Sequence, residues 1–444
     1  MKFAFIENRY KTVFWIALAH ELRSLGHSVV WLVQNPVFTP PGDSTLTIPF
    51  PRRTDLSDGG QINGLDRVRR ADRYINYFGG DDRHYRYYKT VIDQWLDHER
   101  PEVVIGESTL FHELIVIDAC RRQNILYFHP CMLGYPSGRY SVYSYDSKVP
   151  LEHNNELPSE ADCLVLAEAI RKRERVPDYM IPPSGLEPER THPLPRSARD
   201  RLTILRGYLS GERFNTPAPW RKWALDRQIQ QRLKTWQQIA TAKSKESKGQ
   251  RLALYPLQMQ PEANIDVWGQ EFRDQTKLIA QLADALPIGW HLWVKVNPKA
   301  KYELSDELLE VLRTHPQISP IPLHETMAVV FDKVDLICTV TGTVAVECVL
   351  SGKPLVQIGP SIVEEGPGCA RIGTPSEITE VVRRIEMNQF TIANDEERVR
   401  LIQRLYATSF PGMISDPLNM PAVMAADNVR SVANTLLEAA KICV

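Results

Sequence analysis

A Thr-Gly-Thr turn at residues 341–343 joins a strand pattern to a helix pattern in the run L-I-C-T-V-T-G-T-V-A-V-E. Backbone N–H groups at the start of such a helix, with the hydroxyls of Thr341 and Thr343 beside them, can bind an anion such as a phosphate. Gly342 lets the backbone approach that anion closely. Glu347 lies one turn into the helix, where its carboxylate suits a sugar or ribose hydroxyl. The same residues also fit an ordinary capped helix with Thr343 as its N-cap.

Two further turns follow strand patterns in the same half of the chain. The run H-L-W-V-K-V-N-P-K-A-K carries three lysines, Lys295, Lys299 and Lys301. Lysines at a turn are usually only solvated, but Lys295 lies within the strand pattern, where an ammonium group needs a partner. The run Q-M-Q-P-E carries three hydrogen-bonding side chains, those of Gln258, Gln260 and Glu262. Since α/β proteins bind ligands at the carboxyl ends of parallel strands, we expect the three turns to converge on one phosphate-bearing ligand.

The first half of the chain has reactive residues after two strand patterns. Residues 101–106 are followed by Glu107, and residues 125–128 by His129. A carboxylate there can act as base or nucleophile, and a histidine as acid, base or phosphate ligand. The alternatives are that Glu107 favours the dipole of the next helix and that His129 is a hydrogen-bonded core histidine. Arg139, in the turn Y-P-S-G-R, is a candidate anion clamp, because a guanidinium can hold a carboxylate or phosphate with two hydrogen bonds.

Alternating strand and helix patterns must position these residues, and they predict an α/β fold. The strand patterns lie at residues 2–6, 28–33, 101–106, 125–128, 252–255, 291–296, 334–340 and 354–358. The helix patterns lie at residues 10–25, 65–99, 110–122, 158–173, 272–286, 305–314, 344–350, 376–388, 394–407 and 422–441. The first strand, helix and strand form a βαβ unit, which predicts a parallel sheet. Its first turn, Glu7-Asn8-Arg9, has no glycine, so the dinucleotide fingerprint of dehydrogenases is absent.

A chain of 444 residues is too long for one ordinary core, so about two domains are expected. We predict a Rossmann-like domain at 1–200, a basic helical linker at 201–250, a second Rossmann-like domain at 251–395 and C-terminal helices at 396–444. The linker could touch an anionic membrane surface, although a solvated connector is the more ordinary explanation.

Composition excludes several classes of protein. The net charge of −1 argues against a general nucleic-acid binder. Seven cysteines without a C-x-x-C pair favour free thiols in a reducing compartment over disulfides or a zinc site. No signal-peptide pattern opens the chain and no apolar run has the length of a membrane span. We therefore expect a cytoplasmic protein.

Several ordered motifs resemble the capsule polysaccharide biosynthesis/export family, which includes the retaining β-Kdo glycosyltransferases. The close match covers about residues 250–370 and consists of Y-P-L-Q-M-Q-P-E, G-Q-E-F-R-D-Q, L-P-I-G-W-H-L-W-V-K-V-N-P, V-T-G-T-V-A-V-E and G-K-P-L-V-Q-I-G. Looser similarity extends to G-E-S-T-L-F-H-E-L and F-H-P-C-M-L-G-Y-P-S-G-R. The resemblance implies a GT-B architecture, with two Rossmann-like domains facing a cleft. The second domain would bind the nucleotide sugar and the first the acceptor, and the helix at 422–441 could cross back to the first domain.

The resemblance and the residues together give a set of predicted roles. The donor-binding set is Gln258, Gln260, Glu262, Lys295, Asn297, Lys299, Thr341, Gly342, Thr343 and Glu347. Glu107 and His129 are the predicted catalytic residues, and Arg139 is predicted to bind an acceptor group or anion. Neither a metal site nor a resident cofactor is predicted. The predicted co-substrate is a nucleotide sugar, and the resemblance suggests CMP-Kdo or a related CMP-sugar. The predicted acceptor is a surface polysaccharide or glycolipid.

Two positions depart from the family pattern. In the pattern of that family, many relatives carry a histidine where Gln258 stands, and His-Pro where this chain has Asn297-Pro298. An amide keeps hydrogen bonding but cannot transfer a proton. Two alternatives to a glycosyltransferase therefore stay open: a glycerophosphotransferase that uses a CDP-alcohol, and a non-catalytic protein of polysaccharide assembly.

Overall fold

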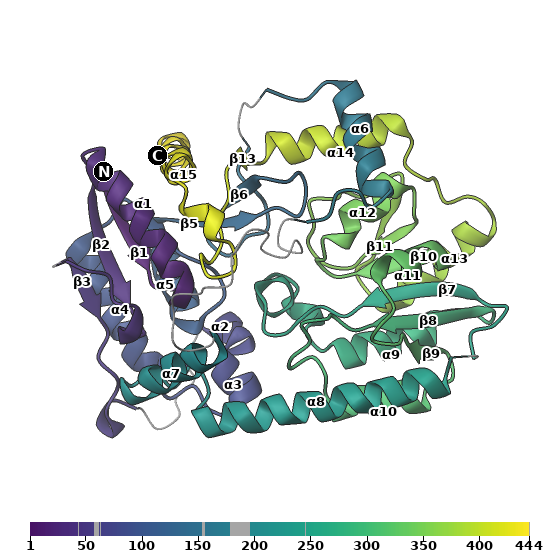
Figure 1. Cartoon of the computed structure of the whole chain (residues 1–444), viewed down its shortest axis with the longest axis horizontal. Helices are drawn as coiled ribbons and strands as arrows, with labels where there is room; N and C mark the ends of the chain where they lie inside the picture. Colours follow the sequence, from purple (N-terminus) through teal and green to yellow (C-terminus); the bar gives the residue numbers. More distant parts are fainter. Residues whose placement is uncertain are drawn as a thin grey trace. The chain divides into compact units, whose positions relative to one another are not determined.

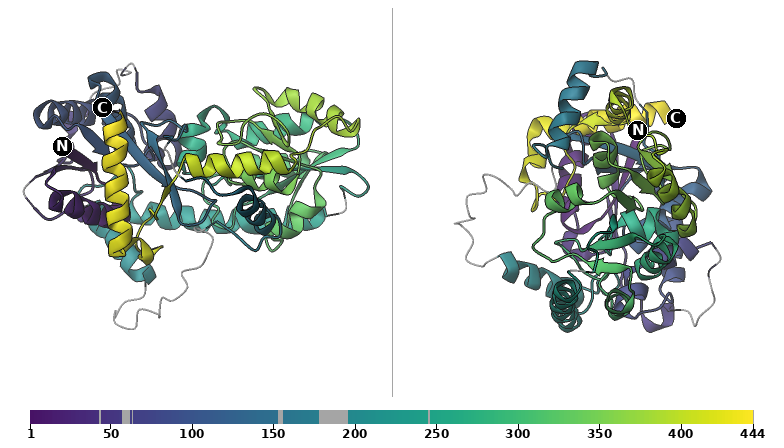
Figure 2. Two further views of the ribbon diagram at one scale, coloured as in Figure 1. Left: turned by 90° about the horizontal axis from the view of Figure 1, so that it is seen from above. Right: turned by 90° about the vertical axis from the view of Figure 1, so that its right-hand side faces the viewer.

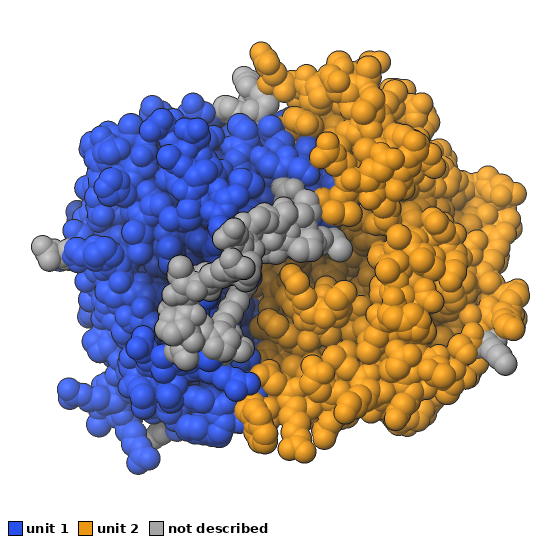
Figure 3. All heavy atoms as spheres, viewed as in Figure 1, with its two compact units in different colours: residues 1–155, 177–222, 407–444 blue, residues 156–176, 223–406 orange. Residues whose placement is uncertain are grey.

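The computed structural model describes residues 1–42, 44–56, 62, 64–152, 156–177, 196–244 and 246–443. The chain divides into two compact units, coloured separately in Figure 3. The first unit consists of Met1–Asn155, Pro177–Lys222 and Ala407–Val444, and the second of Glu156–Val176 and Trp223–Tyr406. Both units are therefore discontinuous in sequence, whereas the domains predicted from the sequence are continuous segments.

The first unit is built on a seven-stranded sheet in the order β13-β6-β5-β4-β1-β2-β3 (Figure 1). Its strands are β1 (Lys2–Ile6), β2 (Ser28–Val33), β3 (Thr45–Thr47), β4 (Val103–Ile105), β5 (Leu126–Met132), β6 (Arg139–Ser144) and β13 (Phe410–Pro411). Strands β3, β2, β1, β4 and β5 are parallel, while β6 is antiparallel to both of its neighbours. Phe3, Phe5, Trp31 and Val33 belong to its apolar core.

Helices accompany this sheet in the βαβ pattern that the sequence predicts. They are α1 (Thr12–Ser24), α2 (Asp66–Ala71), α3 (Arg73–Phe78), α4 (Tyr85–Glu99), α5 (Phe111–Gln123), α7 (Arg196–Leu209) and α15 (Ala426–Cys443). Short 3-10 turns are η1 (Arg9–Lys11), η2 (Pro36–Phe38), η3 (Arg53–Asp55) and η8 (Pro421–Met424). The predicted helix at 65–99 is broken twice, because Asp72 caps the start of α3 and Gly79 ends that helix in the left-handed conformation.

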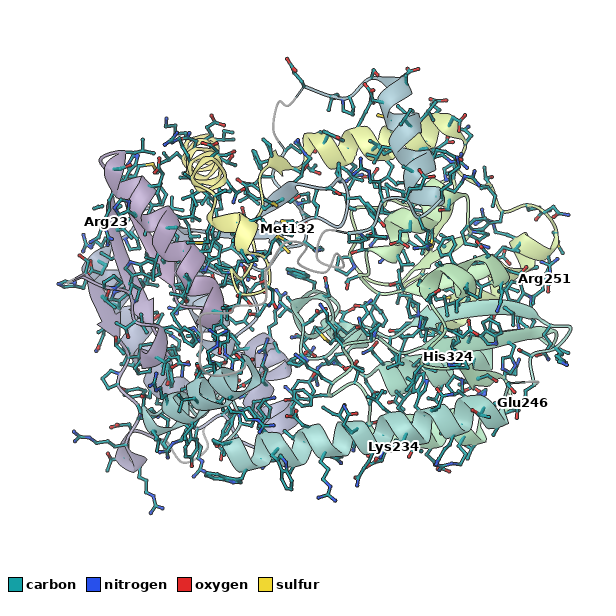
Figure 4. All side chains as sticks on the ribbon, in the orientation of Figure 1. Arg23, Met132, Lys234, Glu246, Arg251 and His324 are labelled. Carbon is teal, nitrogen blue, oxygen red and sulfur yellow. The ribbon has the colours of Figure 1, made fainter. Side chains whose placement is uncertain are left out.

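The last part of the chain completes the first unit. Strand β13 pairs with β6 through Phe410 and Tyr140, and α15 lies against α1 (Figure 2). Met132, labelled in Figure 4, ends β5, and its sulfur accepts a hydrogen bond from the N–H of Ile414 at 3.2 Å. Residues separated by more than 250 positions thus share one sheet and one core.

The second unit is built on a six-stranded parallel sheet in the order β12-β11-β10-β7-β8-β9. Its strands are β7 (Arg251–Pro256), β8 (Trp290–Lys295), β9 (Ile318–Pro320), β10 (Leu336–Thr339), β11 (Leu355–Gln357) and β12 (Cys369–Arg371). Its helices are α6 (Glu160–Arg171), α9 (Gln275–Ala285), α10 (Asp306–Thr314), α11 (Met327–Lys333), α12 (Val344–Ser351), α13 (Ile378–Glu386) and, but for its last residue, α14 (Asp395–Ala407). Helix α8 (Pro219–Ala242) begins in the first unit and continues into the second, and the turns η5 (Asn264–Trp268), η6 (Gln270–Phe272) and η7 (Pro375–Glu377) complete the unit. The predicted α/β class is confirmed.

Each sheet has one point where its connections turn in opposite directions. In the first unit β2 and β3 extend from one side of β1 and β4 and β5 from the other, so this point lies between β1 and β4. In the second unit β8 and β9 lie on one side of β7 and β10 on the other, so it lies between β7 and β10. Open α/β sheets bind ligands beyond the carboxyl ends of the strands at such a switch point. The fold therefore directs attention to the loops after β1, β4, β7 and β10.

Two glycines make room for Val340 beside the second switch point. A Cβ at Gly359 would lie 2.7 Å from Val340 Cγ1 and 2.9 Å from the Val340 carbonyl oxygen, and a Cβ at Gly269 would lie 2.7 Å from the same Cγ1. We expect Gly359→Ala to lower the free energy of unfolding of the second unit by about 1–3 kcal/mol, since the added methyl overpacks this site. Chemical denaturation measures the loss.

Two variants control this prediction. Gly373→Ala adds the same methyl where the nearest atom, Glu377 Oε1, is 3.6 Å away, and it should leave stability nearly unchanged. Val340→Ala is itself destabilising because Val340 is fully buried, but the double variant Gly359→Ala/Val340→Ala should lose less stability than the sum of the two single losses, because the clash with Cγ1 disappears while that with the carbonyl oxygen stays. Equal stability of Gly359→Ala and Gly373→Ala would contradict the prediction.

In the part of the chain that the structure describes, no helix is long and apolar enough to cross a membrane. Cys120, Cys131, Cys163, Cys338, Cys348 and Cys369 are free thiols; the side chain of Cys443 lies outside the described residues.

Candidate functional site

Polar side chains join the two loops at the switch point of the first unit. Asn8, after β1, donates from Nδ2 to Thr109 Oγ1 at 3.3 Å and to Glu113 Oε1 at 2.8 Å. Thr109 belongs to the loop after β4, and Glu113 to the first turn of α5. The loops after β1 and β4 are therefore bonded to each other.

Glu107 lies in this group, two residues after β4. Its side chain is 16% exposed and forms an ion pair with Lys11, whose ammonium group lies 4.9 Å from the centroid of the Trp15 ring. Burial raises the pKa of Glu107, while the positive charge of Lys11 lowers it. A largely buried carboxylate beside a cation at a strand end can act as a base or a nucleophile.

Glu113, rather than Glu107, caps helix α5. Its Oε2 accepts hydrogen bonds from the backbone N–H groups of Thr109 at 3.1 Å and Leu110 at 2.8 Å, so it binds N–H groups at the start of the helix. Its Oε1 accepts from the N–H of Glu107 at 3.2 Å. Glu113 therefore holds the backbone of Glu107 in place, and the Glu107 carboxylate is left to interact with Lys11.

Glu7 is a second carboxylate at this switch point, and sequence reasoning missed it. It is fully buried and accepts hydrogen bonds from the N–H groups of Arg9 at 2.5 Å and Asn35 at 2.9 Å, so it ties the loop after β1 to the loop after β2. Burial raises the pKa of Glu7 to about 7, against the lowering effect of these backbone hydrogen bonds. The sequence did contain the signal, because Glu7 follows the first strand directly.

His112 and Asn215 extend the network with neutral groups. His112 Nε2 donates to the Glu7 carbonyl oxygen at 3.0 Å, and Nδ1 accepts from Asn215 Nδ2 at 3.2 Å. Burial lowers the pKa of His112 to about 4, so the ring is neutral at physiological pH. Asn215 also donates to Gln34 Oε1 at 3.1 Å, which connects the chain after α7 to the end of β2.

His129 and Arg139 lie apart from these contacts. His129 is inside β5, not beyond its end as the sequence predicted, because the strand continues to Met132. Its Nδ1 is bonded to the carbonyl oxygen of Tyr145, its ring stacks on Tyr143 at 5.0 Å, and burial lowers its pKa to about 3. This is the environment of a neutral core histidine.

Arg139 anchors the chain before β13. It donates from Nε to Ser409 Oγ at 2.7 Å and from Nη2 to the Ser409 carbonyl oxygen at 2.6 Å. The guanidinium therefore has a structural role in attaching the last part of the chain, and the proposed clamp on an anion would have to use its remaining donors.

At the switch point of the second unit, Gln258 joins the loops after β7 and β10. In the amide orientation that satisfies both of its polar atoms, its oxygen accepts from the N–H groups of Thr341 at 2.8 Å and Val340 at 3.1 Å, and its nitrogen donates to Thr341 Oγ1 at 2.8 Å. Thr341 in turn donates its hydroxyl to the Asn264 carbonyl oxygen at 2.8 Å. The predicted meeting of these two turns is therefore real, and Gln258 is the residue that joins them.

A second glutamine pair holds the loop after β7. Gln275, at the start of α9, accepts from the N–H of Gln258 at 2.9 Å and donates to the Gln258 carbonyl oxygen at 2.8 Å. It also donates to Gln260 Oε1 at 3.2 Å, and Gln260 donates to Asp266 Oδ1 at 2.8 Å. Gln258 and Gln260 are both buried. The motifs Q-M-Q-P-E and G-Q-E-F-R-D-Q are thus two halves of one hydrogen-bonded structure.

The loop after β8 contributes groups with different surroundings. Lys295 is buried and donates from Nζ to the Glu325 carbonyl oxygen at 2.8 Å; burial lowers its pKa, against the effect of the Glu325 charge. Asn297 is half-buried and accepts from the N–H of Lys299 through Oδ1 at 2.8 Å, and Lys299 is exposed. The partner that Lys295 needs within its strand is therefore a backbone carbonyl.

The start of α12 is partly occupied by internal contacts. The N–H of Gly342 donates to Thr339 Oγ1 at 3.2 Å. Thr343 is half-buried at the N-cap position with helical dihedral angles, and its side chain makes no capping hydrogen bond. The alternative of a helix capped by the Thr343 hydroxyl is therefore not what the structure shows.

Glu347 has a protein partner. Its Oε2 accepts from Arg173 Nη1 at 2.7 Å, and the same guanidinium lies 4.6 Å from the centroid of the Phe331 ring. Arg173 follows α6, so this ion pair attaches the segment Glu156–Val176 to α12. Glu262, after β7, is half-buried and accepts from Asn264 Nδ2 at 3.4 Å.

The structure thus brings predicted donor-binding residues together in the second unit, whereas of the residues predicted in the first unit only Glu107 lies at the switch point. Gln258, Gln260 and Thr341 support one another, while Glu262, Asn297, Lys299, Gly342 and Thr343 keep exposed surface beside them. Among the described residues, no cluster of three or more His, Cys, Asp or Glu side chains could hold a metal ion.

Comparison with known proteins gives matches to solved structures alone. No protein-family model and no curated protein sequence matches the chain. The chain is similar to a beta Kdo 2,4 transferase structure of KpsC from Thermosulfurimonas dismutans, with 13% identity, a TM-score of 0.41 and coverage of 98% of this chain and 97% of that one. It is similar to the beta Kdo 2,7 transferase structure of the same KpsC, with 9% identity, a TM-score of 0.39 and coverage of 97% and 99%. It is also similar to the UDP-GlcNAc 2-epimerase of Methanocaldococcus jannaschii, with 13% identity, a TM-score of 0.27 and coverage of 91% and 99%. Beta-Kdo transferases, which the motifs resemble, are therefore among the solved structures to which this chain is similar.

Proposed function

We propose that this protein is a glycosyltransferase that moves a sugar from a nucleotide donor to a polysaccharide or glycolipid acceptor. The observation that carries the proposal is the bonding of the loops after β7 and β10 through Gln258 and Thr341, at the switch point of the second unit. This is where an α/β sheet binds a nucleotide. The residues that form the junction are those of the motifs that resemble the β-Kdo glycosyltransferases.

The donor-binding residues have two kinds of role in this proposal. Gln258, Gln260 and Thr341 are positioning residues, because their side chains are occupied by one another and by backbone groups. In this proposal the phosphate binds at the start of α12, beside Gly342 and Thr343, and the charge of Lys299 attracts it. Lys295 and Glu347, which have protein partners, stabilise the loops around the ligand.

Glu107 is the proposed catalytic carboxylate of the first unit. In transfer, the bond from the anomeric carbon to the phosphate oxygen breaks and a bond from that carbon to the acceptor oxygen forms. An ionised Glu107 can take the proton of the acceptor hydroxyl or attack the anomeric carbon, and Lys11 favours that ionised form. His129 is left out of the chemistry in this proposal, because its ring is buried and neutral in the core of the sheet. The proposed reaction needs neither metal nor resident cofactor. We place it in the cytoplasm, because a reducing compartment is where cysteines stay free thiols.

A nucleotide panel tests donor binding. We expect one of CMP, UDP, GDP and TDP to raise the melting temperature of the protein by several degrees when present at about 100 times its dissociation constant, since binding then adds about 2.7 kcal/mol of stability. Gly342→Ala should weaken that binding by about tenfold or more, because a Cβ at Gly342 would lie 2.9 Å from Thr339 Oγ1 and displace the turn. Gly373→Ala, in the same unit, should bind as the parent does. Absence of a shift with every nucleotide would refute the proposed donor class.

A non-catalytic role is a second candidate, favoured by the amide of Gln258. The family carries a histidine at this position, and the Gln258 side chain is committed to Val340 and Thr341 instead of being available for proton transfer. Nucleotide binding without turnover of any donor would favour this role. Product mass after incubation with CMP-sugars and with CDP-alcohols separates a glycosyltransferase from a glycerophosphotransferase.

A further inference from the structure

Helix α7 of the first unit exposes an apolar stripe. Leu202, Leu205 and Leu209 are 39%, 42% and 72% exposed. Their spacing of three and four residues puts all three on one face of the helix, within an arc of about 60° at 100° per residue. A helix on the surface of a soluble domain ordinarily turns such a stripe inward.

The opposite face of α7 attaches the helix to the first unit. Asp200 Oδ1 accepts a hydrogen bond from the Tyr10 hydroxyl at 3.2 Å. Gly207 is buried, and a Cβ there would lie 3.6 Å from Asn35 Nδ2. Asp200 and Gly207 point away from the leucines by more than a quarter turn, given the helical period. The leucine stripe is therefore the outward face of a helix whose inward face carries Asp200, the half-buried Ile204 and Gly207.

Positive charge surrounds the stripe. Arg201 and Arg206 are exposed, and helical geometry places one on each side of the leucines. Residues 196–222 contain seven Lys or Arg against two acidic residues, in a chain whose net charge is −1. One of those acidic residues, Glu212, is buried, so it does not screen the surface. The apolar face thus lies in a locally cationic region of a nearly neutral protein.

An exposed tryptophan continues this surface. Trp220, at the start of α8 and within the first unit, is 65% exposed. Its ring meets that of Tyr208 edge to face at 5.1 Å, so it is held beside α7. Tryptophan and tyrosine are enriched where a protein meets the headgroup region of a bilayer.

We propose that the surface formed by Leu202, Leu205, Leu209 and Trp220, with Arg201 and Arg206 at its sides, binds an anionic phospholipid bilayer. Helix α7 (Figure 1) would lie in the plane of the membrane, its leucines inserted among the headgroups and its arginines on the lipid phosphates. A protein partner is less well matched, since flanking arginines around a leucine stripe suit a uniformly anionic surface. This inference is independent of the proposed catalytic function, because none of these residues belongs to the donor or catalytic groups.

Vesicle sedimentation tests the proposal with the full chain. The parent protein should sediment with vesicles of equal parts phosphatidylglycerol and phosphatidylcholine at low salt, but not with phosphatidylcholine alone. Removing two surface arginines in Arg201→Gln/Arg206→Gln should lower the partition coefficient by roughly 10- to 30-fold, since each contributes about 1 kcal/mol near an anionic surface. Leu205→Ser/Leu209→Ser should lower it by about tenfold or more through lost apolar burial.

Matched variants and a second readout keep the test decisive. Arg83→Gln/Arg86→Gln removes the same charge from exposed positions elsewhere in the first unit, and Val149→Ser removes an exposed apolar side chain; both should change partition by about twofold or less. Brominated phosphatidylglycerol should quench part of the tryptophan fluorescence of the parent, and Trp220→Phe should abolish that part. If the double leucine variant does not fold, the quenching of Trp220 fluorescence still tests whether this surface contacts the bilayer.

Three results would overturn the proposal. The first is a parent protein that stays in the supernatant with anionic vesicles at low salt, and the second is a set of α7 variants that partition like their controls. Alternatively, light scattering could reveal a dimer that the leucine substitutions disrupt without any vesicle binding, in which case the stripe is an interface between copies of the chain.

Discussion

Replacing Glu107 by glutamine is expected to lower the rate of sugar transfer by about two to four orders of magnitude, the usual contribution of a positioned acid or base. The substitution keeps the shape of the side chain but removes its charge. Because Glu113 and not Glu107 caps helix α5, the fold should survive. The measurement is the initial rate of product formation with the donor that the nucleotide panel identifies.

Glu102→Gln is the matched control for this variant. Glu102 precedes β4 and Glu107 follows it, so the two carboxylates lie at opposite ends of one strand. The Glu102 side chain is 52% exposed and accepts a hydrogen bond from the N–H of Lys2 at 2.7 Å. Its substitution should leave transfer within about twofold of the parent, because surface changes of this kind alter little. Equal rates for the two variants would show that Glu107 is not catalytic.

The pH profile gives a second test of the same carboxylate. Burial raises the pKa of Glu107 and the charge of Lys11 lowers it, so Lys11→Met removes the lowering effect. The acidic limb of the rate profile should then move to higher pH, because more alkaline conditions are needed to ionise Glu107. Lys11→Arg keeps the charge and should keep the limb in place. If the acidic limb of the rate profile stays at the same pH in Lys11→Met, the ionisation behind that limb is not that of Glu107.

Replacing Asp72 by asparagine is expected to stabilise the first unit at mildly alkaline pH. Asp72 is fully buried at the start of α3, where Oδ2 accepts from the Tyr85 hydroxyl at 2.8 Å and Oδ1 from the N–H of Tyr74 at 2.7 Å. Burial raises its pKa from 3.8 to about 7, against the lowering effect of these hydrogen bonds. Asparagine can accept from Tyr74 and donate to the Tyr85 oxygen, so the variant loses the titration while it keeps the contacts.

The sign of the effect follows from the raised pKa. Between pH 3.8 and about 7 the folded chain retains a proton that the unfolded chain has lost, so the contribution of Asp72 to stability is complete at low pH and is lost as the pH rises through about 7. The full loss is at most about 4 kcal/mol. The stability advantage of Asp72→Asn over the parent should therefore be larger near pH 8 than near pH 5, and it should stay within that limit.

Denaturant unfolding at the two pH values checks this prediction. Glu7, whose pKa burial also raises to about 7, should keep part of the slope in the variant. Asp81→Asn makes the same substitution at an exposed carboxylate that pairs with Arg83, and it should leave the pH dependence unchanged. An advantage of Asp72→Asn over the parent that does not grow from pH 5 to pH 8 would contradict the assignment.

The sequence predicts β1, β2, β4, β5, β7, β8, β10 and β11 because apolar runs bounded by polar turns are local signals, and it does not predict β6, β9, β12 and β13. It fails at the end of β5, where Pro130 looks like a strand terminator. The strand continues because β4 pairs with β5 only as far as Phe128, so residues 129–132 pair with β6 alone. A proline is tolerated where one side of its strand has no partner. This arrangement depends on where a neighbouring strand ends, which the local pattern does not contain.

The candidate site is predictable where residue type and strand end coincide. Gln258 and Thr341 follow strands and do meet, as expected. The sequence does not show which groups a polar side chain will contact. Gln258 and Gln260 are both hydrogen-bonded to Gln275, which lies seventeen residues after Gln258 in the chain. Glu7 was missed because its turn was interpreted only through the absence of a glycine-rich dinucleotide fingerprint. Its position directly after β1 is nevertheless that of a functional carboxylate.

The discontinuous first unit has a consequence for biosynthesis. Its sheet includes β13 and its core includes α15, so it lacks an edge strand and a packing helix until residues 410–443 have been translated. The second unit has all of its residues once Tyr406 is made. The unit that contains β1 is therefore completed after the second unit, which reverses the usual order of cotranslational folding.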